Sequence, residues 1–153
     1  MKIALNQMQV IPGNREKNLQ TMLSSIEQAR HNGVDLLVFP ELCISGYMLG
    51  DWWLSPGFLQ ELHNYNDVIR EASHNIAIIY GNAIADYQLP TRLSTSNHHS
   101  NKDGRIRLYN AACIVQNGKW LNRKQEHTFL PNGIQPKTLL PNYRFFDDER
   151  YFF

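Results

Sequence analysis

The sequence is short of the features that mark several classes of protein. Its 153 residues contain no apolar run close to the roughly 20 residues that a membrane helix needs, and the first residues lack a signal-peptide pattern. The formal net charge is only +1, which gives no electrostatic reason for binding nucleic acid or an acidic membrane. We therefore expect neither nucleic acid nor membrane among its partners.

Cysteine is scarce as well. Cys43 and Cys113 lie far apart in apolar surroundings, which is neither a disulfide framework nor a zinc-ligand spacing. We therefore expect a reducing, cytoplasmic location. The histidines are scattered, and the single adjacent pair, His98-His99, falls in a Ser/Asn-rich stretch that is typical of a solvated loop. The sequence predicts no metal site and no cofactor site in this chain.

What is present is the pattern of one α/β domain with a core, in a chain that is 42% hydrophobic. Short apolar runs predict strands at Lys2–Met8, Leu36–Phe39, Ile76–Ala83 and Arg107–Gln116, with a return strand from Lys119 after the hairpin signal Asn117-Gly118. Helical spacing predicts one helix from Asn14 to Gly33 and a second between Phe58 and His74.

Strand, helix and strand in this order predict a right-handed β-α-β unit with parallel strands. We expect a mixed sheet of about five strands with both helices packed on one face. In the second helix, Val68, Ile69 and Ala72 are predicted to face the core, and a break near Asn64 stays open.

One stretch combines a buried strand with a polar end. Pro40 cannot continue a strand ladder, so Glu41 is predicted just beyond the carboxyl end of Leu36–Phe39. Open α/β sheets bind ligands at such strand ends. The position makes Glu41 a candidate general base, although a solvated loop Glu is the more common explanation of such a local pattern.

The segment Phe39-Pro40-Glu41-Leu42, followed by Ser45-Gly46-Tyr47, resembles the first catalytic segment of the nitrilase (carbon–nitrogen hydrolase) superfamily. In that superfamily the Glu is the general base. The continuation through Asp51 is most similar to the glutaminase domains of glutamine-dependent NAD synthetases. The resemblance implies a nitrilase-like α-β-β-α sandwich, of which residues 1–153 would be the N-terminal part, an incomplete glutaminase domain.

A second segment carries a constrained lysine. Lys137 lies between Pro136 and Pro141, and its ammonium is suited to stabilising an oxyanion or holding a carboxylate base. The segment through Tyr143 and onward to Phe152 resembles the Lys-x-x-Leu-Pro-x-Tyr…Phe-Asp-Glu-x-Arg-Tyr-Phe region of the same glutaminase domains. The resemblance therefore implies that Lys137 is the catalytic lysine. Lys124, which is also followed by Leu-Pro-Asn but at a longer spacing, remains the alternative.

Two tyrosines follow from the resemblance. Tyr47, six residues after Glu41, and Tyr143, six after Lys137, match family positions that contact glutamine. We expect both to bind substrate, with packing at the pocket mouth as an equal alternative.

The superfamily hydrolyses amides with a Cys nucleophile, a Glu base and a Lys. The thiolate attacks the carboxamide, a thioester forms as ammonia leaves, and water completes the hydrolysis. In the family the nucleophile lies beyond the segment that matches Arg150-Tyr151-Phe152, and neither Cys43 nor Cys113 has its position. We therefore expect a fragment, a truncated product or one half of a split protein, inactive alone.

The resemblance implies amide (glutamine) hydrolysis that supplies ammonia for NAD synthesis. It implies no cofactor for this chemistry, with ATP used only in a separate synthetase domain. The expected partners are glutamine or a similar small amide, and either a second copy of the chain or a C-terminal part that completes it. Another amidase of the superfamily and a catalytically dead binding or assembly module are the alternative functions.

Overall fold

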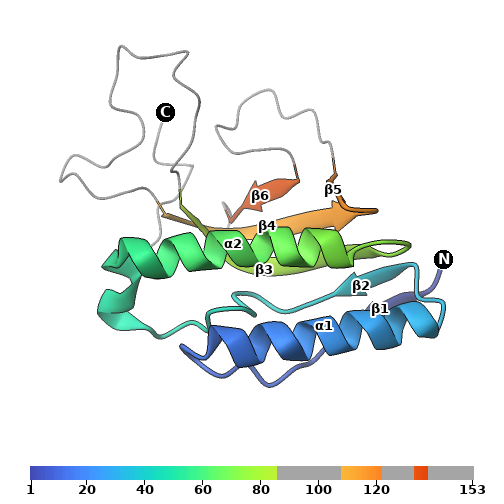
Figure 1. Ribbon diagram of the computed structural model, residues 1–153, viewed down its shortest axis with the longest axis horizontal. Coiled ribbons are helices and arrows are strands. Elements are labelled where there is room, and N and C mark those ends of the chain that lie inside the picture. Colours follow the sequence, from blue (N-terminus) through green and yellow to red (C-terminus); the bar gives the residue numbers. More distant parts are fainter. Residues whose placement is uncertain (86–107, 122–132, 138–153) are drawn as a thin grey trace, which may run out of the picture.

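The computed structural model describes residues 1–85, 108–121 and 133–137 (Figure 1). These residues form an α/β unit of six strands, two α-helices and one 3₁₀ helix. In chain order the elements are β1 Ile3–Leu5, α1 Arg15–His31, β2 Leu36–Val38, η1 Gly50–Leu54, α2 Pro56–Ala72, β3 Ala77–Ala85, β4 Leu108–Gln116, β5 Lys119–Trp120 and β6 Ile134–Pro136.

The sheet is mixed, as expected. Strands β1, β2 and β3 are parallel neighbours, with Leu37 of β2 paired to Ala4 on one side and Ile78 on the other. This confirms the predicted parallel β-α-β unit. Strand β4 pairs antiparallel with β3 along its whole length, and both β5 and β6 pair antiparallel with β4. The sequence did not predict β6, and β1 is shorter than the predicted Lys2–Met8.

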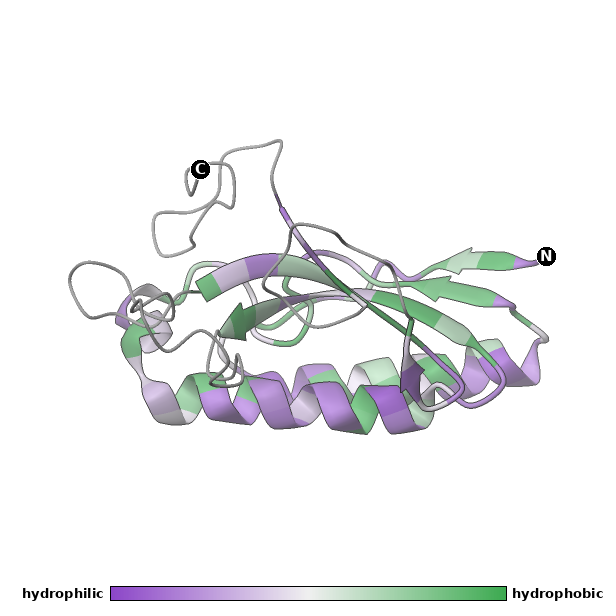
Figure 2. Ribbon diagram, turned by 90° about the horizontal axis from the view of Figure 1, so that it is seen from above, coloured by the Kyte–Doolittle hydropathy of each residue, from purple (hydrophilic) through white to green (hydrophobic). Residues whose placement is uncertain are grey.

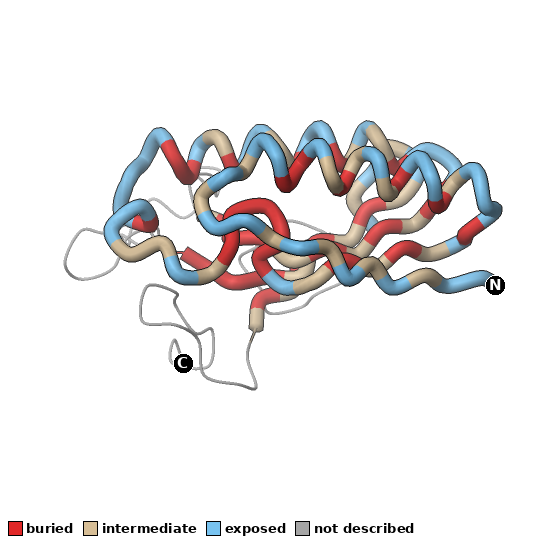
Figure 3. The backbone as a smooth tube through the Cα atoms, turned by 90° about the horizontal axis from the view of Figure 1, so that it is seen from below, coloured by how far each residue is buried: buried red, intermediate tan, exposed pale blue. Residues whose placement is uncertain are grey.

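Both helices cover the same face of the sheet, which Figure 2 shows edge-on. Asn14 is the N-cap of α1, because its side chain accepts a hydrogen bond from the Lys17 amide at 3.2 Å. Gly33 follows the helix with a φ of 64°, the conformation that ends many helices. The residues that α1 turns toward the sheet are buried in Figure 3 and include Leu19, Met22 and Ile26.

Helix α2 differs from the prediction in two respects. It is continuous from Pro56 to Ala72, so the break near Asn64 does not occur. Val68 is 38% exposed and not in the core, because the buried stripe of α2 passes through Leu62, Asn66 and Ile69 and leaves Val68 beside it. Of the three predicted core positions, Ile69 is buried and Ala72 partly buried. Neither helix in the described ranges is long and apolar enough to cross a membrane.

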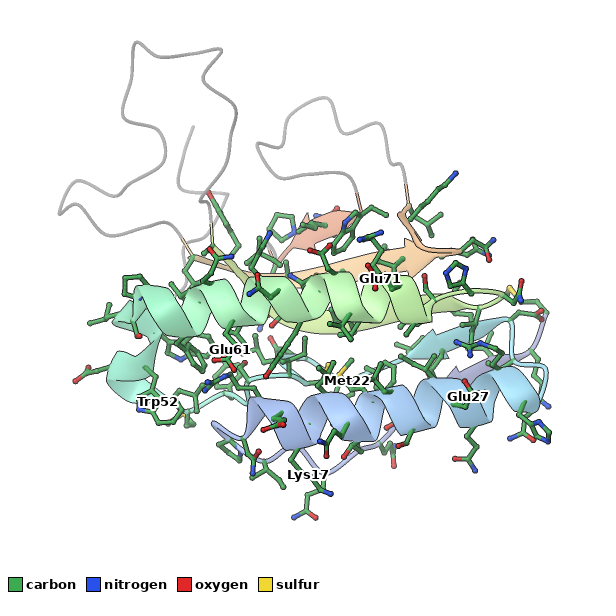
Figure 4. The ribbon with its side chains drawn as sticks, in the orientation of Figure 1. Lys17, Met22, Glu27, Trp52, Glu61 and Glu71 are labelled. Carbon is green, nitrogen blue, oxygen red and sulfur yellow. The ribbon has the colours of Figure 1, made fainter. Side chains whose placement is uncertain are left out.

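An ion pair joins the two helices at one end. Arg15 of α1 pairs with Glu61 of α2, and its guanidinium lies 4.9 Å from the centre of the Phe58 ring. Figure 4 shows Glu61 and Met22 between α1 and α2, and Lys17 directed away from α2. The Arg15–Glu61 ion pair therefore joins the two helices, and apolar residues pack between the helices and the sheet.

The predicted hairpin at Asn117-Gly118 is confirmed, since both residues have positive φ values of 51° and 73°. The turn is also tied to the end of α2. The Asn117 amide donates to the Ser73 carbonyl at 2.8 Å, and a guanidinium nitrogen of Arg70 donates to the Gly118 carbonyl at 2.8 Å. These bonds fix β4 at its Gln116 end, far from the site described next.

Candidate active site

The segment that carries Glu41 crosses over β3 at Gly81. The Gly81 amide donates to the Pro40 carbonyl at 3.1 Å, and the Cys43 amide donates to the Gly81 carbonyl at 3.0 Å. A Cβ on Gly81 would lie 2.5 Å from the Cα of Glu41, so only glycine permits this approach. Glu41 thus follows the end of β2, as predicted, and lies between two residues, Pro40 and Cys43, that are hydrogen-bonded to the neighbouring strand.

The residues after Glu41 are locked by the core. Leu42 has a positive φ of 46°, which is rare for a side-chain-bearing residue, and it is fully buried. Gly46 has a φ of 79° and packs against Pro12, where a Cβ would lie 2.6 Å from the Pro12 Cα. The buried Leu42 side chain and the close contact between Gly46 and Pro12 hold this loop in one conformation. A solvated loop lacks such contacts.

Lys137 meets Glu41 across 96 positions of the sequence. The residue directly follows β6, and its Nζ lies 2.9 Å from Oε1 of Glu41. The two residues that the family resemblance singled out are therefore in contact. The Lys137 side chain is 26% exposed and that of Glu41 is 47% exposed, so a small solute can reach the pair. Lys124, the alternative lysine, lies outside the described residues.

Asn110 of β4 contacts both members of the pair. Its Nδ2 donates to Oε1 of Glu41 at 2.5 Å, and its backbone carbonyl accepts a hydrogen bond from the Lys137 amide at 2.8 Å. Asn110 is 3% exposed. The sequence reading gave it no role. The sequence did contain a sign of such a role, namely an Asn within an apolar strand. A buried polar side chain has to find a hydrogen-bond partner.

A pocket of about 370 Å³ surrounds these groups. It opens on the sheet face away from the helices, because Tyr80 and Asn82 contact Asn66 of α2 and the residue between them, Gly81, faces the other way. The walls are mostly apolar and the polar groups converge at one side, as in many small-molecule sites. Its lining residues are Phe39, Glu41, Ile79, Tyr80, Gly81, Asn110, Ala111, Ala112, Gln135, Pro136 and Lys137.

Neither cysteine is placed to act in this pocket. Cys43 is fully buried against Met22, with its Sγ 3.6 Å from the Met22 sulfur, and burial raises its pKa to about 12. Cys113 is paired with Tyr80 in the β3–β4 ladder, and burial likewise raises its pKa. Both thiols are therefore protonated at neutral pH, whereas the attacking species in thiol chemistry is the thiolate.

The tyrosines are less well defined as site residues. Tyr47 is partly buried and packs against the core, and it is not among the described residues that line the pocket. Tyr143 lies outside the described residues. Substrate contact by either one stays a prediction. Within the ranges that the structure covers, no three His, Cys, Asp or Glu side chains gather as metal ligands.

Comparison with known proteins decides the family. A family model described as carbon-nitrogen hydrolase matches residues 2–147. The chain belongs to the carbon-nitrogen hydrolase family. It is 30% identical over 152 residues to the glutamine-dependent NAD(+) synthetase of Thermotoga maritima, covering 99% of this chain and 22% of that protein. The corresponding synthetase of Xylella fastidiosa strain Temecula1 is 31% identical over 153 residues, of which the chain spans 23%.

Solved structures give the same fold. A glutamine-dependent NAD(+) synthetase from Cytophaga hutchinsonii matches 95% of this chain and 21% of its own, with a TM-score of 0.69 and 22% identity. That of Acinetobacter baumannii, solved with ADP, matches 97% of this chain and 23% of its own, with a TM-score of 0.65 and 28% identity. A variant of the amidase from Nesterenkonia sp. AN1 in complex with butyramide matches 94% and 45%, with a TM-score of 0.61 and 17% identity. The expected nitrilase-like α/β fold class is confirmed.

Proposed function

We propose that this chain supplies the base and the lysine of a glutaminase site, as the N-terminal part of a glutamine-dependent NAD synthetase. The observation that carries the proposal is the 2.9 Å contact between Lys137 Nζ and Glu41 Oε1 in a pocket of about 370 Å³. The similarity to NAD synthetases along 99% of the chain supports glutamine as the amide. The ammonia released would serve a synthetase domain that uses ATP.

Each residue has a role that follows from its chemistry. Glu41 accepts the proton of the attacking thiol and returns it to the departing amine, so that ammonia leaves as the thioester forms. The Lys137 ammonium stabilises the negative charge that develops on the carbonyl oxygen. Tyr47 and Tyr143 contact the glutamine. Because Cys43 and Cys113 are buried with raised pKa values, the thiol comes from a segment outside these 153 residues.

A chimera tests these roles. Residues 1–147 replace the matching N-terminal part of the Thermotoga maritima synthetase, and NAD synthesis is measured with glutamine or with an ammonium salt. We expect E41Q and K137M to lower the glutamine-supported rate at least roughly 100-fold, the scale of a lost base or charge stabiliser. The ammonium-supported rate should not change, which shows that the variants are folded. An E41Q chimera that still uses glutamine would refute the role of the base.

The isolated chain gives a second test. Purified residues 1–153 should release no ammonia from glutamine, because a coupled catalytic set loses nearly all its rate advantage without its nucleophile. Turnover that disappears in C43S or C113S would prove the nucleophile argument wrong. Release of ammonia by the chimera from other amides but not from glutamine would favour another amidase. Glutamine binding without turnover in the chimera would favour a binding module.

A further inference from the structure

Asn110 is the one described residue that is bonded to both Glu41 and Lys137. Its side chain fixes the carboxylate and its main chain fixes the strand that delivers the lysine. The two bonds use different groups of the same residue, and that residue is almost completely buried in the longest antiparallel ladder of the sheet. Asn110 therefore fixes the positions of both Glu41 and Lys137 relative to the sheet.

Strand β6 alone would hold Lys137 only weakly. It has three residues and ends in Pro136, which lacks an amide hydrogen and donates no ladder bond to β4. The next amide along the chain is that of Lys137, and it bonds to the Asn110 carbonyl at 2.8 Å. This bond continues the β4–β6 pairing past the proline and defines where the Lys137 side chain begins.

The ion pair with Lys137 would not by itself hold the Glu41 carboxylate in one position. Exposed lysine–carboxylate pairs contribute little order, because both long side chains retain rotamer freedom and water competes for them. Glu41 is 47% exposed, yet the donor on Asn110 is buried and immobile in its strand. Both Nδ2 of Asn110 and Nζ of Lys137 converge on Oε1. Among the described residues no donor reaches Oε2, which is left to accept a proton.

We propose that Asn110 is a positioning residue that holds Glu41 by Oε1, directs Oε2 to the thiol as the proton acceptor, and sets the register of Lys137. The catalytic part of this inference rests on the proposed glutaminase function, whereas the positioning part concerns this chain alone. An amide is required because its nitrogen donates to the carboxylate. The isosteric N110D replaces that donor with a second carboxylate, which repels Glu41 and competes for Lys137.

The test follows the ¹⁵N NMR signal of the Lys137 ammonium in the 153-residue chain. We expect a distinct signal in the native chain and its loss or a large shift in N110A and N110D. The double variant N110D/E41Q should restore it, because the amide introduced at position 41 then donates to the carboxylate introduced at position 110, which pairs with Lys137. A merely structural defect at position 110 has no reason to be rescued by a change at an exposed side chain.

N82A is the matched control. Asn82 is another fully buried Asn, on the adjacent strand, but its side chain bonds to Asn66 and to the Leu62 carbonyl on the helix side. N82A should lower the melting temperature and leave the Lys137 signal in place. If N110A and N110D do not fold, the native chain and E41Q suffice, because the Asn110 side-chain amide proton should be shifted downfield in the native chain and return in E41Q. An unchanged Asn110 amide or an unchanged Lys137 signal overturns the proposal.

The chimera separates this inference from the proposed function. With glutamine, N110D should lower kcat at least roughly tenfold while KM changes little, because a misplaced base affects the chemical step more than binding. The ammonium-supported rate should be unaffected. If the native chimera does not use glutamine at all, the proposed function fails, and the NMR result still decides whether Asn110 positions the pair.

Discussion

Glu41 lies directly over Gly81, with its Cα 2.5 Å from the place a Gly81 Cβ would occupy. The same Cβ would lie 2.7 Å from the Leu42 amide nitrogen, and both neighbours are backbone atoms that cannot rotate away. The position of Glu41 therefore depends on the absence of a side chain at Gly81 on the neighbouring strand.

We expect G81A to lower the free energy of unfolding by roughly 3 kcal/mol or more, because a methyl group in this contact forces the Glu41 loop off the sheet. Urea unfolding followed by circular dichroism measures the loss. G57A is the control, since Gly57 in α2 has nothing within 4 Å of its Cβ position, and it should stabilise the chain by about 0.5–1 kcal/mol. Equal stabilities of G81A and the native chain would contradict the packing described here.

The Glu41–Lys137 pair should matter little for stability. Both side chains are partly exposed, and exposed ion pairs typically contribute less than about 1 kcal/mol. K137M should accordingly change the urea midpoint only slightly while it removes the glutamine-supported activity of the chimera. A K137M chain that is destabilised by more than about 2 kcal/mol would indicate that the pair is structural.

Stability should fall at high pH because of the buried thiols. Burial raises the pKa of Cys43 from its ordinary value of 9.0 to about 12 and also raises that of Cys113. Above pH 9 the unfolded chain releases these protons and the folded chain keeps them, so the stability present below pH 9 is lost as pH rises toward 12. The slope should approach roughly 1 kcal/mol per pH unit for each thiol.

Urea unfolding at pH 8, 9 and 10 measures this dependence. The variant C43A/C113A removes both titrating thiols and should show a flatter profile than the native chain over the same interval. Profiles of equal slope would mean that the thiols ionise without unfolding and that their burial is overstated.

Self-association is expected through β1. This strand is at the end of the described sheet, and its outward residues Ile3 and Leu5 are 51% and 74% exposed. An open strand edge with apolar side chains favours pairing between chains. Analytical ultracentrifugation should show a concentration-dependent mass that falls toward the monomer in L5K. V68K, at an exposed apolar position of α2, should leave the mass unchanged.

The parts of the fold that the sequence predicted are those with local signals. An unbroken apolar run followed by proline placed the end of β2 and hence Glu41, and Asn-Gly placed the hairpin. Glu41 and Lys137 were singled out together for another reason, namely the resemblance of their two segments to one family. Whether Glu41 and Lys137 are catalytic is a chemical question that activity measurements answer.

The features that the sequence did not predict depend on contacts between residues that are far apart in the chain. Strand β6 has three residues and ends in proline, and it exists because β4 offers a pairing edge to it. Asn110 acquires its role only when that pairing brings Lys137 to its carbonyl. Val68 was wrongly predicted to face the core because the buried stripe of α2 includes Asn66. Asn66 is polar, so hydrophobicity alone assigns it to the surface, but it forms hydrogen bonds with Tyr80 and Asn82.

The separation of 96 positions between Glu41 and Lys137 also sets an order of assembly during synthesis. Chains emerge from the ribosome N-terminus first, and contacts across long stretches form only after the loop between them is closed. Glu41 can be seated once β3 with Gly81 has emerged, Asn110 arrives with β4, and Lys137 follows last. We expect a nascent chain that stops before β6 to carry a placed carboxylate and amide without a lysine, so that the pocket gains its positive charge in the final step of translation of the described residues.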